Sequence, residues 1–295
     1  MSLKNSVVVV VVVLGVSVAA VSAVTADEIT WLSRNTEGVP ATGLDSGADV
    51  IYPASYILHP SSSPMGTLQL TILAYTDDWI HTSPNTYVEQ ALSRLGVTAT
   101  IYVDGDYAGF ETALTTGGPW DIVIWSGENT TVPTTTTAAL LAYVQGGGAL
   151  AATYWRQLYI PTDPLWAEMG FTYISNYVTP PPVYWWDPTN PIFTTPESAP
   201  EWLVRVQNSG TSQGTRIEPL AAGVAIAGYT TTATANEAGL VVRDDGLTIY
   251  KGLRDVSTNA DSDGDTIPDG VELWENIITA LITAVPVELM EFRID

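Results

Sequence analysis

The stretch "PWDIVIWSGENTTVPTTTTAALLAYVQGGGALAATYW", residues 119–155, decides the predicted fold. Its first apolar run, residues 120–126, has the composition of a buried strand, and residues 132–148 then show a helix pattern that ends on three glycines. A second apolar run, residues 149–155, follows the glycines directly. A strand, a helix and a strand at this spacing form a βαβ unit with parallel strands. We therefore expect a parallel sheet that helices cover on both faces.

The same alternation continues on either side of this stretch. Strands are predicted at residues 67–75 and 97–103, and helices at 83–96, 107–117 and 162–170. The rhythm predicts an α/β fold with a doubly wound, mainly parallel sheet flanked by helices, as in flavodoxin-like proteins. The first of these helices is expected to start with Ser83 as its N-cap and Pro84 at its first helical position.

The rhythm changes after Phe171. Residues 179–193 are rich in proline and aromatic residues, which predicts a long surface or lid-like loop. A closing amphipathic helix is predicted at 271–285. Three segments between them have strand patterns, and a hairpin turn is expected at Asp244-Asp245-Gly246: residues 216–230, 238–244 and 247–253.

Residues 119–155 resemble the central segment of the class I glutamine amidotransferase-like superfamily, and the likeness is to secreted bacterial members. The resemblance implies an amidotransferase-like sheet over residues 67–285. Catalytic members carry a nucleophilic cysteine on an elbow after the strand that corresponds to residues 149–154. This chain has Tyr154-Trp155-Arg156 there and no cysteine anywhere, and neither His59 nor His81 lies late enough to match the family's catalytic histidine. The sequence therefore does not support the amidotransferase reaction, and we expect a domain without its own catalysis.

The N-terminus reads as an export signal. Lys4 precedes an apolar run from Val7 to Ala20, and small residues stand before the expected cleavage point at residue 26. An uncleaved membrane anchor is the alternative, because the apolar run is just long enough to cross a bilayer. We expect cleavage, a secreted or cell-surface protein, and no membrane contact afterwards. Residues 27–66 are predicted to form an irregular extension.

The composition excludes several functions. With 10 basic and 32 acidic residues, the formal net charge is −22, and such a chain is repelled by nucleic acid. The absence of cysteine excludes disulfides and thiolate chemistry. An acidic surface suits cations, salty surroundings or simple solubility.

The segment "DSDGDTIPDGVE", residues 261–272, has the spacing of a twelve-residue calcium loop. Calcium prefers six to eight oxygen ligands, which such a loop supplies from positions 1, 3, 5, 7, 9 and 12. The loop resembles those of thrombospondin type 3 repeats and dockerin-like modules. Its predicted metal ligands are Asp261, Asp263, Asp265, the Ile267 carbonyl, Asp269 and Glu272.

Two features depart from an EF-hand. Thr266 stands at position 6, where a positive φ favours glycine, and Gly264 stands at position 4 instead. A strand rather than a helix precedes the loop. The alternative is an acidic surface turn whose aspartates cap the helix that begins at Val271. We expect calcium as the cofactor, in a stabilising rather than catalytic role.

A second candidate site lies where the parallel strands end. The carboxyl ends of parallel strands meet at one edge of a sheet, which is where open α/β sheets bind ligands. The alternative is that these acids cap the following helices. The residues expected at this edge, which we call the rim, are Asp77, Asp78, Trp79, Asp104, Asp106, Glu128, Asn129, Trp155 and Arg156.

These patterns leave three functions open. The first is a non-catalytic binding or scaffold domain that engages carbohydrate or another surface protein at the rim. The second is an extracellular hydrolase that acts on glycans with strand-end carboxylates. The third is a purely structural domain of a larger surface protein, because residues 286–295 resemble the start of a linker to a C-terminal module.

Overall fold

The computed structural model describes residues 70–78, 81–205, 213–255 and 261–285. The predicted export signal, the extension at 27–66 and the linker-like tail at 286–295 lie outside these residues.

Five parallel strands form the core of the sheet, in the order β2-β1-β3-β4-β10. The chain changes direction across the sheet between β1 and β3, as it does in flavodoxin-like folds. The predicted α/β class with a doubly wound, mostly parallel sheet is thereby confirmed. The strands are β1 (Ile72–Asp77), β2 (Thr100–Val103), β3 (Ile122–Gly127), β4 (Ala149–Tyr154) and β10 (Thr248–Lys251).

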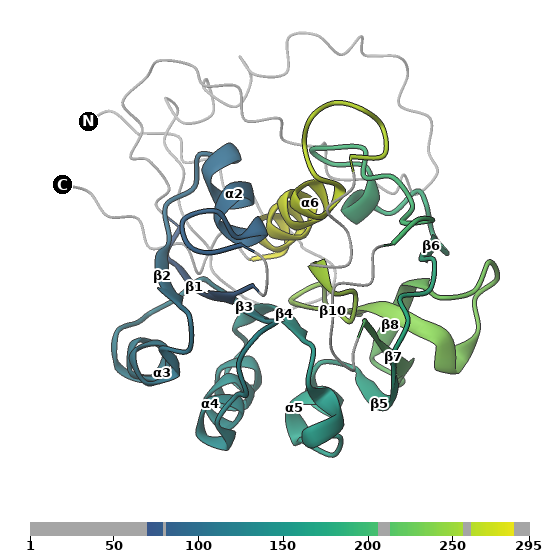
Figure 1. Ribbon diagram of the computed structural model, residues 1–295. Helices are drawn as coiled ribbons and strands as arrows, with labels where there is room; N and C mark the ends of the chain where they lie inside the picture. The colour runs from purple at the N-terminus through teal and green to yellow at the C-terminus, as the bar shows by residue number, and fades with distance from the viewer. Residues whose placement is uncertain (1–69, 79–80, 206–212, 256–260, 286–295) are drawn as a thin grey trace, which may run out of the picture. The chain divides into compact units, whose positions relative to one another are not determined.

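Helices cover both faces of this core, with α3, α4 and α5 along one face and α2 and α6 on the other (Figure 1). Among the described residues, no helix combines the length and the apolar composition that a bilayer crossing needs. The helices are α2 (Tyr87–Arg94), α3 (Tyr107–Thr116), α4 (Thr134–Gln145), α5 (Pro164–Glu168) and α6 (Asp269–Ala284).

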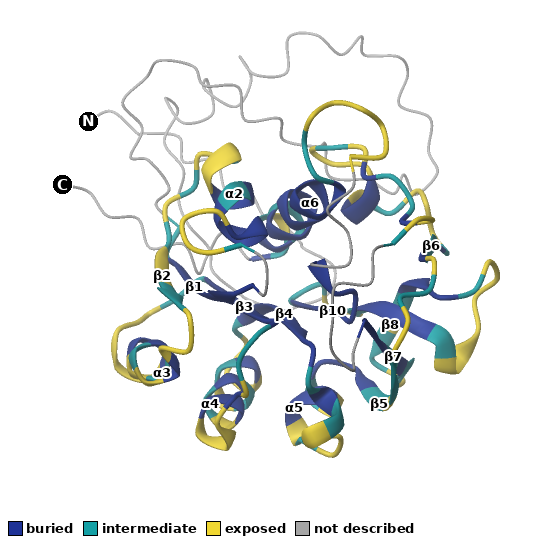
Figure 2. Ribbon diagram, in the orientation of Figure 1, coloured by how far each residue is buried: buried dark blue, intermediate teal, exposed yellow. Residues whose placement is uncertain are grey.

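Alternate residues of each central strand enter different cores, because successive side chains of a strand point to opposite faces. Ile72 and Ala74 of β1 pack in the core that contains α2 and α6. Leu73 and Tyr75 pack on the opposite side, with α3, α4 and α5. The central strands are buried along their whole length (Figure 2), which explains why they read as continuous apolar runs.

An antiparallel extension completes the sheet beyond β10. β9 pairs with β10 through the predicted hairpin turn, and β7 and β8 pair with β9. The predicted strand at 216–230 is in fact two strands, and residues 171–177 form an edge strand that the sequence did not predict. The added strands are β5 (Phe171–Tyr177), β6 (Tyr184–Trp185), β7 (Gly214–Pro219), β8 (Gly223–Gly228) and β9 (Ala238–Arg243).

The aromatic residues of the predicted lid-like loop pack onto the domain. Trp185 stacks on Phe193 with 4.2 Å between ring centroids, and its indole N–H donates to the Ala199 carbonyl at 3.0 Å. The indole N–H of Trp186 donates to the Thr230 carbonyl at 2.7 Å. Trp185 and Phe193 therefore belong to the core on the α2 and α6 side, whereas Trp186 packs against the opposite core.

Helix α2 begins later than predicted. Its N-cap is Thr86 rather than Ser83, and the Thr86 hydroxyl accepts a hydrogen bond from the Glu89 amide. The Glu89 carboxylate accepts bonds from the amide of Thr86 and from the hydroxyls of Thr86 and Ser83. This reciprocal capping box fixes the start of the helix, and it draws Ser83 to the same carboxylate.

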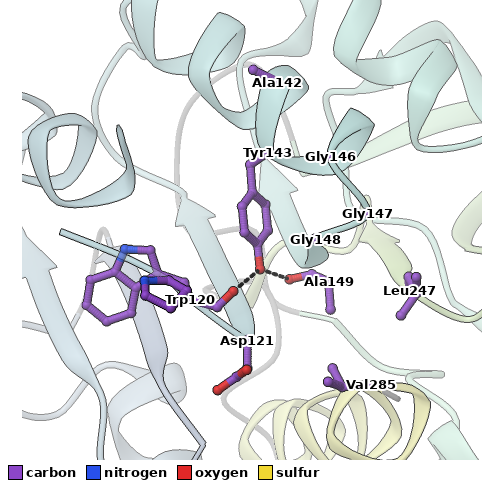
Figure 3. A pocket seen from close by; sticks show the side chains of 11 residues that line it. Trp120, Asp121, Ala142, Tyr143, Gly146, Gly147, Gly148, Ala149, Leu247 and Val285 are labelled. Carbon is purple, nitrogen blue, oxygen red and sulfur yellow. Dashed lines mark hydrogen bonds between the residues drawn. The ribbon is translucent and has the colours of Figure 1, made fainter. Parts of the chain in front are cut away.

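The three glycines after α4 allow the helix to turn closely into β4. Gly147 has a φ of +87°, which favours glycine. The Tyr143 ring lies directly against Gly148, and its hydroxyl donates to the carbonyls of Trp120 and Ala149 (Figure 3). The turn thus links the amino ends of β3 and β4.

Replacing Gly148 with alanine should destabilise the fold. The added Cβ would lie 2.3–2.5 Å from atoms of the Tyr143 ring, so the ring must move. We expect the free energy of unfolding to fall by about 1–3 kcal/mol in urea denaturation. The matched control is Gly146→Ala, where φ is −77° and the nearest atom would be 3.3 Å away. Equal stability of the two variants would contradict this packing.

Candidate functional site

The Asp77 carboxylate at the end of β1 is surrounded by hydrogen-bond donors. One oxygen accepts from the amides of Glu128 and Asn129 at 2.6 and 2.9 Å. The other accepts from the Thr130 amide at 2.8 Å, from the Thr130 hydroxyl and from the Tyr75 hydroxyl. Asp77 is fully buried, so these bonds satisfy a carboxylate that has left water.

Three successive backbone N–H groups that converge on one point form an anion-binding concavity. This concavity stands at the change of direction between β1 and β3, the usual ligand position of open α/β sheets. The chain's own Asp77 occupies it. The rim therefore uses these donors internally, and they hold the loop after β3 in place.

A buried ionic cluster lies beside Asp77. Lys251 at the end of β10 pairs with Asp255, and its ammonium nitrogen lies 3.9 Å from the Glu128 carboxylate. The Asp255 amide donates to Glu128 at 2.8 Å, and the Trp274 indole N–H of α6 donates to the Asp255 carboxylate at 2.6 Å. Burial raises the pKa of Glu128 to about 8, and the Asp255 carboxylate adds to this effect. The cluster joins β3, β10 and α6.

His81 and Asp78 form a second polar pair at this edge. The His81 Nδ1 atom lies 2.6 Å from a carboxylate oxygen of Asp78, and the imidazole ring packs against the Tyr87 ring. Asp78 is buried, and the His81 side chain is 24% exposed. The hydrogen bond to Asp78 raises the pKa of His81.

The remaining predicted rim residues lie apart from the cluster or at its margin. Asp104 and Asp106 are exposed, and Asp106 caps α3 by accepting from the Gly109 amide at 3.0 Å. The guanidinium of Arg156 lies over the Trp155 ring, 4.1 Å from its centroid. Trp79 lies outside the described residues. Of the described rim acids, Asp106 caps a helix, Asp104 is exposed, and Asp77, Asp78 and Glu128 are buried.

Sequence reasoning missed three members of the buried cluster. Lys251 ends the last strand, and Arg254 and Asp255 follow it. Arg254 donates to the Glu128 carbonyl at 3.2 Å. One signal was present, because Lys251 is one of only two lysines in the chain and stands at the end of an apolar strand.

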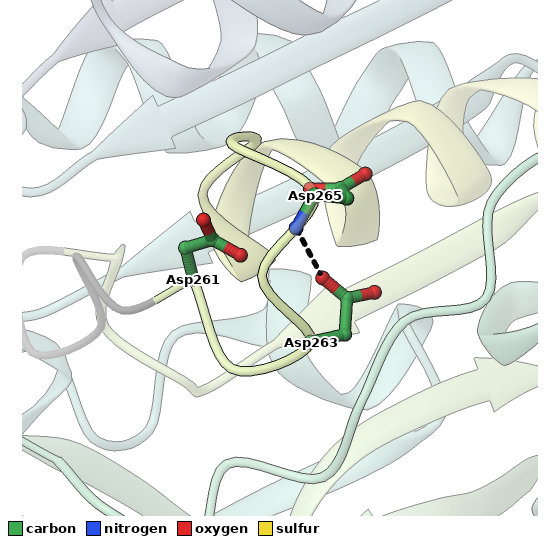
Figure 4. Close-up of side chains that lie close together, drawn as sticks. All are labelled: Asp261, Asp263 and Asp265. Atoms are coloured by element: carbon green, nitrogen blue, oxygen red, sulfur yellow. Dashed lines mark hydrogen bonds between the residues drawn. The ribbon is translucent and has the colours of Figure 1, made fainter.

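The acidic loop brings three predicted metal ligands together. Carboxylate oxygens of Asp261, Asp263 and Asp265 all lie within 4.8 Å of one another, and the side chains are exposed (Figure 4). Asp261 accepts from the amides of Gly264 and Thr266 at 2.7 and 2.9 Å. Asp263 accepts from the Asp265 amide at 3.2 Å. These short-range bonds fold the loop around its carboxylates.

Thr266 adopts the backbone conformation that the calcium-loop spacing requires at position 6. Its φ is +80°, and that of Gly264 is +83°. A β-branched residue in this region carries strain of about 1–3 kcal/mol. The departure in sequence therefore does not change the turn, although it makes the turn costly.

Two further predicted ligands come from the first turn of α6. Both carboxylate oxygens of Asp269 accept from Ser262, at 2.8 Å from its amide and 2.6 Å from its hydroxyl. Glu272 is 1% exposed, and its Oε2 atom makes no hydrogen bond within the described part of the chain. Burial raises the pKa of Glu272 to about 8, with Asp263 and Asp265 adding to the effect. The Glu272 carboxyl group is thus buried with one oxygen unpaired among the described residues, and it does not belong to the group of carboxylates that lie within 4.8 Å of one another.

The aspartates of the loop do not cap α6. The helix starts at Asp269, two residues earlier than predicted, and its N-cap Pro268 makes no side-chain capping bond. Asp261, Asp263 and Asp265 instead bond amides within the loop. The structure thus shows no capping of α6 by Asp261, Asp263 or Asp265, while the acidic surface turn stays the alternative to a metal site. A metal role for Ile267, Asp269 and Glu272 stays a prediction.

The structure is that of an α/β protein whose rim donors are bonded by its own side chains, with an acidic loop before its last helix. No protein-family model matches the chain, and no curated protein matches it.

Several solved structures are distantly similar. A ThuA-like protein of Bacteroides uniformis shares 11% identity over 78% of this chain and 95% of its own, with a TM-score of 0.43. PurLQS of Thermotoga maritima shares 10% identity over 72% of this chain and 99% of its own, with a TM-score of 0.44. Alpha-L-fucosidase isoenzyme 2 of Paenibacillus thiaminolyticus shares 14% identity over 75% of this chain and 33% of its own, with a TM-score of 0.46. We therefore base the fold class on the strand order of this chain.

Replacing Asp77 with asparagine should destabilise the protein strongly. The new amide group would direct its own N–H donors at backbone N–H groups that now bond a carboxylate. We expect a loss of about 2–4 kcal/mol in the free energy of unfolding, since hydrogen bonds to charged groups contribute about 1.5–3 kcal/mol each. The control, Asp104→Asn, changes an exposed residue with a φ of 49° and should alter stability by less than about 0.5 kcal/mol. Similar losses in both variants would count against the Asp77 bonds.

The His81–Asp78 pair should stabilise the protein at low pH. Because the pKa of His81 is raised in the folded state, the contribution is complete below about pH 6.5 and is lost as pH rises through the folded value. The difference in melting temperature between the wild type and His81→Gln should therefore shrink between pH 6 and 8. NMR titration of the His81 ring measures the pKa directly, and a value at or below 6.5 would refute the pairing.

Proposed function

We propose that this chain is a calcium-binding α/β domain of a secreted or cell-surface protein, with a binding or scaffold role and no catalysis of its own. The bound ion would tie residues 261–267 to the first turn of α6. The observation that carries the proposal is the triad of Asp261, Asp263 and Asp265, whose carboxylate oxygens lie within 4.8 Å of one another.

The charges of the loop favour a cation. Three carboxylates within 4.8 Å of one another repel each other in water. Among the described residues, no lysine, arginine or histidine forms an ion pair with them. A calcium ion would supply the missing positive charge and accept oxygens at flexible geometry, with the Ile267 carbonyl and water completing its shell.

The position of the loop indicates a structural role for the ion. Asp255 precedes the loop and is held by Trp274, while Ser262 inside the loop is held by Asp269. Both partners belong to α6, so the loop returns to the helix that follows it. An ion bound by both the triad and Glu272 would connect the loop to α6 and stabilise this helix against the sheet.

We propose binding rather than catalysis because the rim lacks the free reactive groups that catalysis would need. The chain has no cysteine, so the nucleophile of the class I amidotransferases is absent. Asp77 fills the anion-binding position, and Glu128 belongs to a buried ionic cluster. Carbohydrate or another surface protein would therefore contact the exposed rim residues Asp104 and Asp106. A glycan hydrolase would need two free carboxylates facing one another, and Asp77 and Glu128 are already engaged.

Calcium should raise the melting temperature of the protein. At a calcium concentration one hundred times the dissociation constant, the stabilisation is about 2.7 kcal/mol, or roughly 5–10 °C for a domain of this size. The measurement is a thermal scan with calcium and with chelator, beside a calorimetric titration. The double variant Asp263→Ala, Asp265→Ala should lose both effects, whereas Glu218→Ala, Asp244→Ala removes two charges elsewhere and should keep them.

An equal melting temperature in calcium and chelator would overturn the structural role of the ion. Thr266→Gly separates the two reasons for such a result, because glycine adopts the positive φ of position 6 without strain. If only this variant binds calcium, the threonine has disabled the natural loop. If neither binds, the acidic cluster is a solvated turn.

A further inference from the structure

A pocket of about 320 Å³ opens at the edge of the sheet opposite the rim. It lies at the amino ends of β3, β4 and β10, which contribute Trp120, Ala149 and Leu247 (Figure 3). Gly146, Gly147 and Gly148 form another wall, and Val285 at the end of α6 closes the pocket. Its size is at the lower end of the range of about 300–1,000 Å³ for ligand sites, so it suits one or two large side chains.

The polar groups of the pocket walls already have partners. The Asp121 carboxylate accepts from the amide and hydroxyl of Thr71, at 2.7 and 2.8 Å. The Tyr143 hydroxyl donates to two backbone carbonyls. Among the described residues that line the pocket there is no lysine, arginine or histidine. An anion would therefore find no counter-charge here, and an apolar group gains most by entering.

The chain itself carries such groups next to the pocket. Val285 is a wall residue, and "PVELMEFRID" follows it directly, at residues 286–295. From Met290 onward the segment alternates strictly: Met290, Phe292 and Ile294 are apolar, and Glu291, Arg293 and Asp295 are charged. Such alternation is typical of an extended segment with one buried face.

We propose that the pocket is the docking site of this C-terminal segment, which lies along the amino edge of the sheet with Phe292 in the pocket. Six residues separate Val285 from Phe292, and at up to about 3.3 Å per residue this is enough chain to turn back and place Phe292 in a pocket that Val285 itself lines. The tether makes docking intramolecular, which raises the effective concentration of the segment.

The tethered segment is a better occupant than a second copy of the chain. Two copies would each bring a formal net charge of −22 to the contact, and this repulsion opposes association. The segment 286–295 carries only three acids and one arginine and needs no encounter between molecules.

Photo-crosslinking in the full chain tests this placement. A photoreactive phenylalanine analogue at position 292 should crosslink to peptides that contain residues 119–121 or 142–149, within the same molecule. The same analogue at position 293, on the charged side of the segment, should give at most about a tenth of that yield. Crosslinks elsewhere in the chain, or equal yields from both positions, would overturn the proposal, and crosslinks between two molecules would assign the pocket to a second copy.

Hydrogen exchange supplies a second measurement without a crosslinker. Phe292→Ser should speed exchange at residues 142–149 by about tenfold, because burying a phenylalanine contributes more than the free energy of one decade in an equilibrium. Arg293→Ser is the matched control and should leave exchange unchanged. Ala142→Trp, at an exposed position on the pocket wall, should fill the pocket and make exchange insensitive to Phe292→Ser. Equal exchange in the wild type and Phe292→Ser would refute docking.

Discussion

The buried ammonium group of Lys251 links the segments that follow β3 and β10. It lies between the carboxylates of Glu128, which follows β3, and Asp255, which follows β10. Two carboxylates this deep in the protein would repel each other strongly without a cation between them, and losing one partner of a buried pair costs about 3–5 kcal/mol. Asp255 also bonds Trp274, so the same group fixes α6 against the sheet. The acidic loop begins just beyond this anchor.

At the carboxyl edge of the sheet, buried hydrogen-bond donors and charges are therefore paired with other groups of the same protein. Asp77 takes the position that a bound anion has in other open α/β sheets, and Lys251 takes the position of a bound cation. Groups that bind external ligands in other open α/β sheets here form internal bonds that stabilise the protein itself. Among the described residues, a triad of aspartates without an ion pair lies in the acidic loop, and a largely apolar pocket lies at the opposite edge of the sheet.

The parallel core could be predicted because its strands are apolar throughout and are separated by glycines and helix signals. β5 was missed because an edge strand needs few buried residues, and "FTYISNY" mixes polar and apolar side chains. The predicted start of α2 was wrong because the sequence offers two equally good start signals. One is Ser83-Pro84 and the other is Thr86 with Glu89, and only the packed chain decides between them. The rim residues could be named from strand order alone. Their partners could not, because Lys251 meets Glu128 only when β10 pairs with β4.

The burial of Lys251 also determines which amines the protein presents to solvent. Lys4 and Lys251 are the only lysines, and Lys251 is 1% exposed. A chain cleaved after residue 26 would keep one lysine, hidden in the folded state, and one free α-amino group. An amine-reactive label applied to such a native protein would attach at its first residue, and a second label would enter only when the domain opens. Such a cleaved chain would carry one site for conjugation at its first residue and, in Lys251, an internal reporter of unfolding.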